Sequence, residues 1–268
     1  INEYLDACFP YVKEVAINEN GDIWMLPVSV NIPGFLVNEE YLAKEAVPLE
    51  NNITYEEFLA IYEKLDNDLL SKTSFNTYLL HNNFIAQTIN KNMNLDERFG
   101  DILKKFQKYN NMIPKTIIPL DLNKDFLFDS FSNLNYFSES LKMIKNPDSL
   151  RVYSMPKLDP TDKNTGTCSF LIVNANSDNK KTVLAYLEDL IAYIMNQETT
   201  PFFFKEPVPE KDTLRGSIYD LYENGEISFY IDSDTYSGLT EVIESGSDQA
   251  IEEYIQETER KLRIYFNE

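Results

Sequence analysis

Short apolar runs alternate with helical repeats along this chain, and turn residues separate them. Residues 23–25 and 35–37 are apolar runs of strand length, and the first follows the turn signal Gly21-Asp22. Pro27 lacks a backbone donor, so we expect the chain to leave its sheet at that point. The pattern predicts a strand, a crossing and the start of a helix between residues 21 and 42.

Helix starts are marked by capping residues. Asn38 precedes two glutamates, which suits the first turn of a helix, and Thr54 with Glu57 forms a capping box. Apolar residues follow that box at helical spacing, namely Phe58, Ile61, Tyr62 and Leu65. We expect a further helix over residues 1–16, divided at Pro10 because proline breaks a helix interior.

The later chain continues this alternation, so the sequence predicts an α/β class. We expect helices within residues 73–110, a strand at 126–128, a polar and aromatic loop at 129–137, and a crossing at 201–209. Two later helices have apolar faces that we expect to be buried. The first face comprises Val183, Leu184, Leu187, Leu190, Ile191, Ile194 and Met195, and the second comprises Ile251, Tyr254, Ile255, Leu262, Tyr265 and Phe266.

Composition narrows the class of partner. With 44 acidic and 24 basic side chains the net charge is −20, which repels nucleic acid. The hydrophobic content of 43% indicates a folded chain. No apolar run approaches the roughly 20 residues of a membrane-spanning helix.

Groups for catalysis or metal binding are scarce. His81 is the single histidine, so a histidine-based metal cluster is excluded. Asp121, Asn123 and Asp125 match the start of a calcium loop, but Phe126 and Ser132 stand where that loop needs Gly and Glu. We therefore expect no metal site, no cofactor and no enzymatic activity.

Several segments of the chain resemble family 1 of the extracellular solute-binding proteins of ABC importers, the family of the maltodextrin-binding type. Residues 21–42 keep the family's strand crossing, with Gly21, Pro27 and Asn38 in register. The phrase at 54–58, the strand and helix pattern of 150–195 and the closing helix at 248–268 are similar to later parts of the family. The likeness extends over nearly the whole chain in the expected order.

This resemblance implies a two-lobed, periplasmic-binding-protein-like fold of type II. The chain would hold mostly the C-terminal lobe, lacking the N-terminal part of the family. Remnants of the first lobe would lie at 1–28 and 166–196, and the second lobe at 34–157 and 200–268. The hinge crossings are expected near 29–33, 158–165 and 197–199.

The resemblance also implies a function. The protein would capture a small extracellular solute, with a carbohydrate as the expected ligand, and deliver it to an ABC permease. It would be a monomer located outside the cell or in the periplasm. An alternative is a cell-surface interaction lipoprotein that kept the fold without transport. Cys8 and Cys168 would both lie in the first lobe, where a disulfide is conceivable and two buried thiols are the other possibility.

Ligand-binding residues follow from position in the family pattern. We expect the ligand to contact Ser29, Asn31, Asn133 and Tyr136, with Phe137 as the alternate to Tyr136. An amide or hydroxyl would bond the hydroxyl groups of a sugar, and an aromatic ring would stack on its apolar surface. Trp24 is expected nearby as a buried ring that does not contact the ligand.

Overall fold

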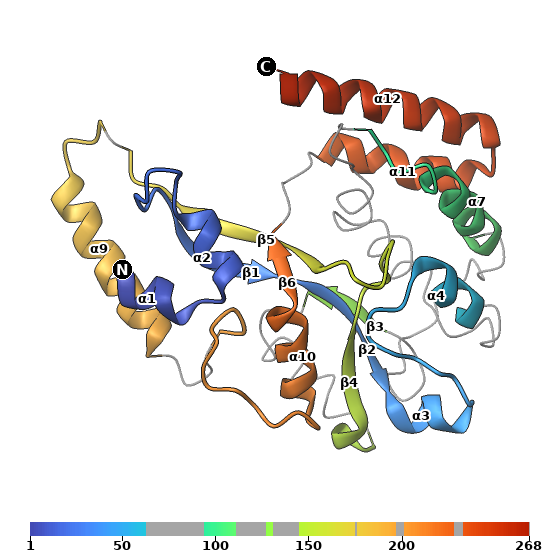
Figure 1. Cartoon of the computed structure of the whole chain (residues 1–268), viewed down its shortest axis with the longest axis horizontal. Coiled ribbons are helices and arrows are strands. Elements are labelled where there is room, and N and C mark those ends of the chain that lie inside the picture. The colour runs from blue at the N-terminus through green and yellow to red at the C-terminus, as the bar shows by residue number, and fades with distance from the viewer. Residues whose placement is uncertain are drawn as a thin grey trace.

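The computed structural model describes residues 1–62, 94–110, 127–130, 145–174, 176–196, 201–227 and 233–267. Two small sheets lie near the middle of an elongated molecule, and helices cover both ends (Figure 1). The helices are α1 (Asn2–Ala7), α2 (Pro10–Ala16), α3 (Glu39–Lys44), α4 (Tyr55–Tyr62), α7 (Phe99–Asn110), the 3₁₀ turn η2 (Pro147–Ser149), α9 (Lys180–Met195), α10 (Leu214–Glu223), α11 (Ser233–Ser245) and α12 (Asp248–Asn267).

Each sheet has three strands. In the first sheet, β5 (Asn164–Leu171) lies between β1 (Leu26–Asn31), to which it is antiparallel, and β6 (Gly225–Ile227), to which it is parallel. In the second sheet, β2 (Pro33–Asn38) lies between β3 (Leu127–Ser130) and β4 (Leu150–Ser154), and both pairings are antiparallel. Ile32 alone separates β1 from β2, so the chain passes between the sheets at one residue.

Two hydrophobic clusters divide the molecule. We call the first sheet with α1, α2 and α9 the first part, and the second sheet with α3, α4, α7, α11 and α12 the second part (Figure 1). The second part surrounds a core that includes Phe35, Phe58, Phe99 and Leu239, each almost fully buried. The cluster of the first part also includes residues of α10 and the inner residues of β4, so α10 lies where the two parts meet.

Local signals in the sequence are confirmed. The helix of residues 1–16 is divided, because α1 ends at Ala7 and α2 begins with Pro10 in its first turn. The side chain of Asn38 accepts hydrogen bonds from the backbone N–H groups of Glu40 and Tyr41, at 2.9 and 3.4 Å. The predicted capping box also forms, since the Glu57 N–H donates to Thr54 Oγ1 at 3.2 Å and the Thr54 N–H donates to Glu57 Oε2 at 2.9 Å.

The predicted start of the crossing was wrong. Residues 23–25 form no strand beyond a single bridge of Ile23, and β1 begins at Leu26 and runs through Pro27 to Asn31. A proline is tolerated there because, among the described residues, β1 pairs with β5 alone, and the pairing shifts register between Pro27 and Ser29. The chain leaves the first sheet only at Ile32.

Trp24 is not the buried ring that we expected. Its side chain is 52% exposed, and its indole N–H donates to the backbone oxygen of Val15 at 3.1 Å. The single polar atom of the ring is therefore satisfied by the backbone of α2 while the ring itself stays at the surface.

Helix α9 forms where predicted, but its apolar face is only partly buried. Only Leu187 and Ile191 of the seven expected residues are buried among the described part of the chain, whereas Leu184 and Met195 are 45% and 44% exposed. Helical spacing places such residues on one face, but burial also requires another element to cover that face.

The segment after residue 200 packs differently from the predicted lobe assignment. The Phe9 N–H donates to Phe203 O at 3.0 Å and the Lys205 N–H donates to Ala7 O at 2.9 Å, so this segment lies along α1 and α2. Strand β6 pairs with β5 of the first sheet. Three consecutive phenylalanines drive this packing, because they complete the cluster of the first part. The other predicted lobe boundaries stay predictions.

Two further predictions were borne out in the described residues. Strand β3 forms at Leu127–Ser130, within one residue of the predicted start, and α12 buries Ile251 and Leu262 with Tyr254 and Ile255 packed against the same cluster. Helix α7 accounts for residues 99–110 of the predicted helical region. Residues 73–93, with His81, and the loop with Asp121, Asn123 and Asp125 lie outside the described residues.

Candidate ligand-binding site

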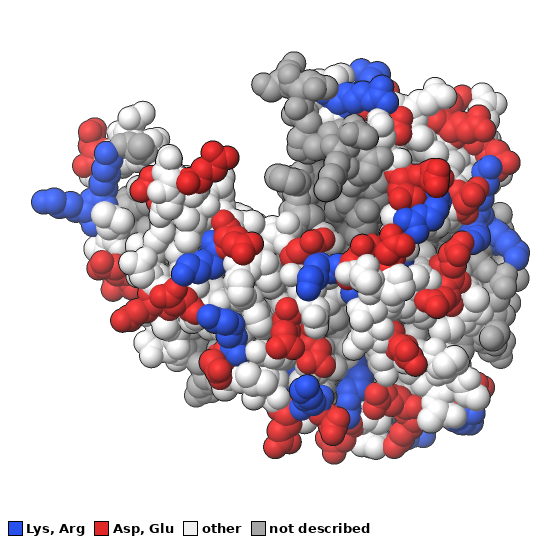
Figure 2. All heavy atoms as spheres, viewed as in Figure 1, with Lys and Arg blue, Asp and Glu red and all other residues white. Residues whose placement is uncertain are grey.

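The crossing between the two sheets lies beneath a hollow in the molecular surface. Figure 2 shows this hollow between the end that carries α1, α2 and α9 and the end that carries α11 and α12. Strands that end beneath a cleft between two parts bring their last side chains to its floor, and such places are where open α/β folds bind ligands. The candidate site therefore lies at the end of β1 and the adjoining first half of β5.

A row of small polar side chains lies on one face of the first sheet. Strand pairing sets Asn31 opposite Thr167 and Ser29 opposite Ser169. Because side chains alternate along a strand, these four share one face, while Val30 is buried on the other. Asn31 and Thr167 are half-buried and nearest to the crossing, where they can offer an amide and a hydroxyl to a polar ligand.

The structure thus places two of the five predicted ligand residues, Ser29 and Asn31, on one face of the sheet. It brings two further polar residues, Thr167 and Ser169, beside them. Thr167 and Ser169 were not predicted, although the alternation of hydroxyl residues in the phrase Asn-Thr-Gly-Thr-Cys-Ser was a usable signal. Asn133, Tyr136 and Phe137 lie outside the described residues. The last described residue before them, Ser130, pairs with Pro33 and is therefore next to the crossing.

The returning connection from β4 to β5 is held by the second part. The Tyr55 N–H donates to Lys157 O at 3.0 Å, and the Lys157 N–H donates to Ile53 O at 2.9 Å. Arg98 donates to both carboxylate oxygens of Asp159, each at 3.1 Å, and these bonds hold the pKa of the Asp159 carboxyl below its usual range. The connection is therefore attached to the second part by hydrogen bonds as far as Asp159.

A buried ammonium lies in the same connection. The Lys157 side chain is 1% exposed, and its Nζ donates to Asn52 Oδ1 at 2.5 Å. Burial lowers the pKa of this amine, and the carboxylates of Asp162 and Glu226 act in the opposite direction. Thr165 donates to Glu226 Oε1 at 3.1 Å, and this bond joins β5 to β6 within the first sheet.

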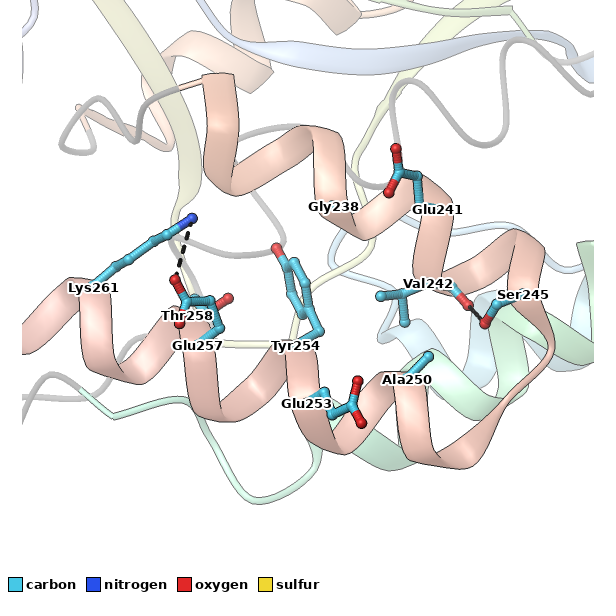
Figure 3. A pocket seen from close by; sticks show the side chains of 10 residues that line it. All are labelled: Gly238, Glu241, Val242, Ser245, Ala250, Glu253, Tyr254, Glu257, Thr258 and Lys261. Atoms are coloured by element: carbon cyan, nitrogen blue, oxygen red, sulfur yellow. Dashed lines mark hydrogen bonds and ion pairs between the residues drawn. The ribbon is translucent and has the colours of Figure 1, made fainter.

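A second hollow of about 400 Å³ lies between α11 and α12 (Figure 3). Two of its acidic groups have partners on the same helix, since Glu253 accepts from Gln249 and Glu257 pairs with Arg260 and Lys261. It shares no residue with the crossing. Within the described ranges no group of three His, Cys, Asp or Glu side chains is arranged to hold a metal ion.

Both cysteines are free thiols. Cys8 is buried and Cys168 is partly buried, and burial raises the pKa of each thiol to about 12. Burial likewise raises the pKa of the Tyr153 hydroxyl to about 12. In the described part of the chain, no helix has the length and apolar character needed to cross a membrane.

These raised pKa values predict a loss of stability in alkali. In the unfolded chain a thiol ionises near pH 8.5 and a tyrosine near pH 10, whereas the folded protein keeps both protonated to about pH 12. The folded state then binds more protons than the unfolded state, so the free energy of unfolding should fall as the pH rises above about 8.5.

Urea unfolding at a series of pH values from 7 to 11 measures this effect. The Cys8→Ala variant serves as the control, because it removes one of the groups and should flatten the decline. A free energy of unfolding that stays constant over this range would contradict the prediction.

Comparisons with known proteins bear on the fold. Neither the family models nor the curated proteins that were searched match this sequence. Solved structures match over nearly the whole chain. The sugar-binding protein MalE from Xanthomonas citri has a TM-score of 0.63 and 15% identity, over 97% of this chain and 75% of that one.

Two further structures agree with MalE. Apo RafE from Streptococcus pneumoniae has a TM-score of 0.65 and 11% identity, over 97% of this chain and 77% of its own. The galacto-N-biose and lacto-N-biose I binding protein of an ABC transporter from Bifidobacterium longum has a TM-score of 0.62 and 12% identity, over 99% of this chain and 77% of its own.

These matches define the fold. The chain has the two-lobed α/β fold of ABC-transporter solute-binding proteins, and it extends over about three quarters of their length. The resemblance inferred from residues 21–42 and 150–195 is confirmed at the level of the fold.

Proposed function

We propose that this protein captures a carbohydrate outside the cell or in the periplasm and delivers it to an ABC permease in the membrane. The observation that carries the proposal is the match over 97% of the chain to proteins described as sugar-binding, among them RafE solved with raffinose. The crossing at Ile32 beneath an open hollow supports it, since capture in such a fold uses closure of two parts around a ligand. No chemical step is required of the protein.

The polar face of the first sheet supports a carbohydrate as the ligand. Sugars present many hydroxyl groups, each able to donate and accept, and amide and hydroxyl side chains match them without adding charge. Asn31 and Thr167 provide such groups at the crossing, with Ser29 and Ser169 further along the same face. The predicted stacking ring, Tyr136 or Phe137, would cover the apolar surface of the sugar.

Asn31 is expected to contribute directly to affinity. Replacing it by alanine leaves a ligand hydroxyl without its partner in a desolvated cleft, which costs about 1–3 kcal/mol, or roughly 5- to 150-fold in Kd. Calorimetry with a panel of oligosaccharides that includes raffinose and lacto-N-biose measures this loss. Asn176→Ala is the matched control, because Asn176 is an exposed amide beyond the end of β5.

The outcomes separate the ligand class from the residue. If no oligosaccharide gives a binding signal while the protein is folded, the proposal of carbohydrate capture is wrong. If a sugar binds but Asn31→Ala and Asn176→Ala have the same affinity as the unaltered protein, Asn31 does not contact the ligand.

A further inference from the structure

One buried residue, Ile32, connects the two sheets. Ile32 is fully buried and stands alone between the last residue of β1 and the first residue of β2. A rotation of one part against the other that is centred on this crossing must change the backbone angles at or beside Ile32. Whatever holds this residue therefore influences the angle between the parts.

Two glycines leave room for the Ile32 side chain. A Cβ added to Gly166 of β5 would lie 2.7 Å from Ile32 Cγ1 and 2.8 Å from Asn31 O, and a Cβ added to Gly225 of β6 would lie 2.5 Å from Ile32 Cδ1. Real Cβ atoms do not approach other atoms so closely, so glycine is needed at both positions. The side chain of Ile32 is therefore seated against both neighbouring strands of the first sheet.

The hydroxyl of Tyr222 contacts the backbone at the crossing. It donates to Val30 O at 2.9 Å, and the Ile32 N–H donates to the Tyr222 hydroxyl oxygen at 3.5 Å. Tyr222 is fully buried, and burial raises the pKa of this hydroxyl, so it remains a donor at all physiological pH values. A single side chain thus bonds two backbone groups that flank Asn31.

Helix α10 connects Tyr222 to the second part. The Val152 N–H of β4 donates to Ser217 Oγ at 2.9 Å, and Leu221 Cδ1 lies 2.9 Å from the position of a Cβ on Gly34 of β2. The other end of the helix is bonded to the first sheet, because Asn164 Nδ2 donates to Leu221 O at 3.0 Å. Helix α10 is therefore bonded to both sheets, one on each side of the crossing.

We propose that Tyr222 is a positioning residue that fixes the angle between the two parts, by bonding the backbone at the crossing from a helix attached to the second sheet. Its loss should let the parts sample a wider range of angles without unfolding either. The inference rests on the proposed function, in which closure of the parts captures the solute, but it concerns the ligand-free protein and can be tested without a ligand.

The test compares two matched variants of the whole chain, Tyr222→Phe and Tyr4→Phe. Tyr4 is equally buried, and its hydroxyl donates to Pro27 O of the same strand at 2.6 Å, at the end away from the crossing. Each variant loses one buried hydroxyl that bonds β1. Spin labels on non-natural residues at the exposed positions 181 in α9 and 252 in α12 then report the distance distribution between the two parts.

The expected result is a broader or shifted distance distribution for Tyr222→Phe and an unchanged one for Tyr4→Phe, although both variants lower Tm. An unchanged distribution for Tyr222→Phe, or equal broadening for Tyr4→Phe, would overturn the proposal. If Tyr222→Phe does not fold, Ser217→Ala provides a second test, because it removes the hydrogen bond from the Val152 N–H by which α10 is attached to the second sheet. A wild-type distribution for Ser217→Ala would then refute the proposal.

The distance measurement on the spin-labelled protein requires no ligand, so its outcome is independent of the proposed function. A protein that binds no sugar but shows the broadened distribution refutes the proposed function and keeps the role of Tyr222. A protein that binds sugar with an unchanged distribution in Tyr222→Phe refutes the role of Tyr222 alone.

Discussion

Phe35→Ala is expected to lower the free energy of unfolding by about 3–5 kcal/mol, because it empties the centre of the second part. Phe35 lies on β2, the middle strand of the second sheet, and its side chain is fully buried. Its ring centroid is 5.7 Å from that of Phe58 in a tilted contact and 5.9 Å from that of Tyr153 in a stacked contact. The variant loses both aromatic contacts and leaves a cavity between the sheet and α4.

Urea denaturation followed by circular dichroism measures this loss. The control is Tyr186→Ala on α9, whose ring is 63% exposed and whose removal should change the free energy of unfolding by no more than about 0.5 kcal/mol. A loss below 1 kcal/mol for Phe35→Ala would contradict the packing of the second part.

Gly216→Ala is expected to destabilise the protein by about 1–3 kcal/mol, although alanine favours a helix. Gly216 lies in the first turn of α10, where its N–H donates to Thr213 Oγ1 at 3.0 Å. An added Cβ would lie 2.1 Å from Glu210 O and 2.6 Å from Lys211 O. These are backbone atoms, so relief requires movement of the loop before the helix and not of one flexible side chain.

Gly100→Ala on α7 is the matched control for this substitution. An added Cβ there meets only side-chain atoms, Ile255 Cδ1 at 3.3 Å and Ile251 Cγ2 at 3.9 Å, and the end of Ile255 can shift by a rotamer adjustment. This variant should be neutral or stabilised by up to roughly 1 kcal/mol through helix propensity. Thermal and urea unfolding of both variants test the pair, and a Gly216→Ala variant as stable as Gly100→Ala would contradict the close approach of the loop.

Features that depend on neighbouring residues in the sequence were predictable. The Asn38 cap, the capping box of Thr54 and Glu57, and the break at Pro10 each form within one helical turn. The two caps are formed between residues two or three positions apart, so the sequence contains the whole interaction.

Features that depend on distant packing were not predictable from the pattern. Seven apolar residues of α9 share a face by spacing, but only Leu187 and Ile191 are buried in the described structure. Residues 202–204 read as an apolar segment between prolines, and nothing near them in sequence indicated that they would pack on α1 and α2. The surface position of Trp24 likewise depends on a bond to Val15 in another element.

The candidate site likewise combines residues that the sequence predicted with residues that only the fold brings together. Ser29 and Asn31 were predicted from a family resemblance in one continuous segment, and their contact with a ligand stays a prediction. Thr167 and Ser169 come from a strand more than 130 residues away, and only the register of β1 against β5 brings them beside the first two. The role of Tyr222 at the crossing has the same origin, since 192 positions separate it from Val30.

The late return of the chain to its first strand has a consequence for biosynthesis. β1 leaves the ribosome well before its partners β5 and Tyr222, which lie far later in the chain. Such non-local pairing slows folding, and the open edge and apolar side chains of the early strand stay available to other chains in the meantime. A nascent chain halted before β5 should therefore hold its first part unfolded, and a chaperone that binds extended apolar segments should associate with it until β5 and α10 emerge.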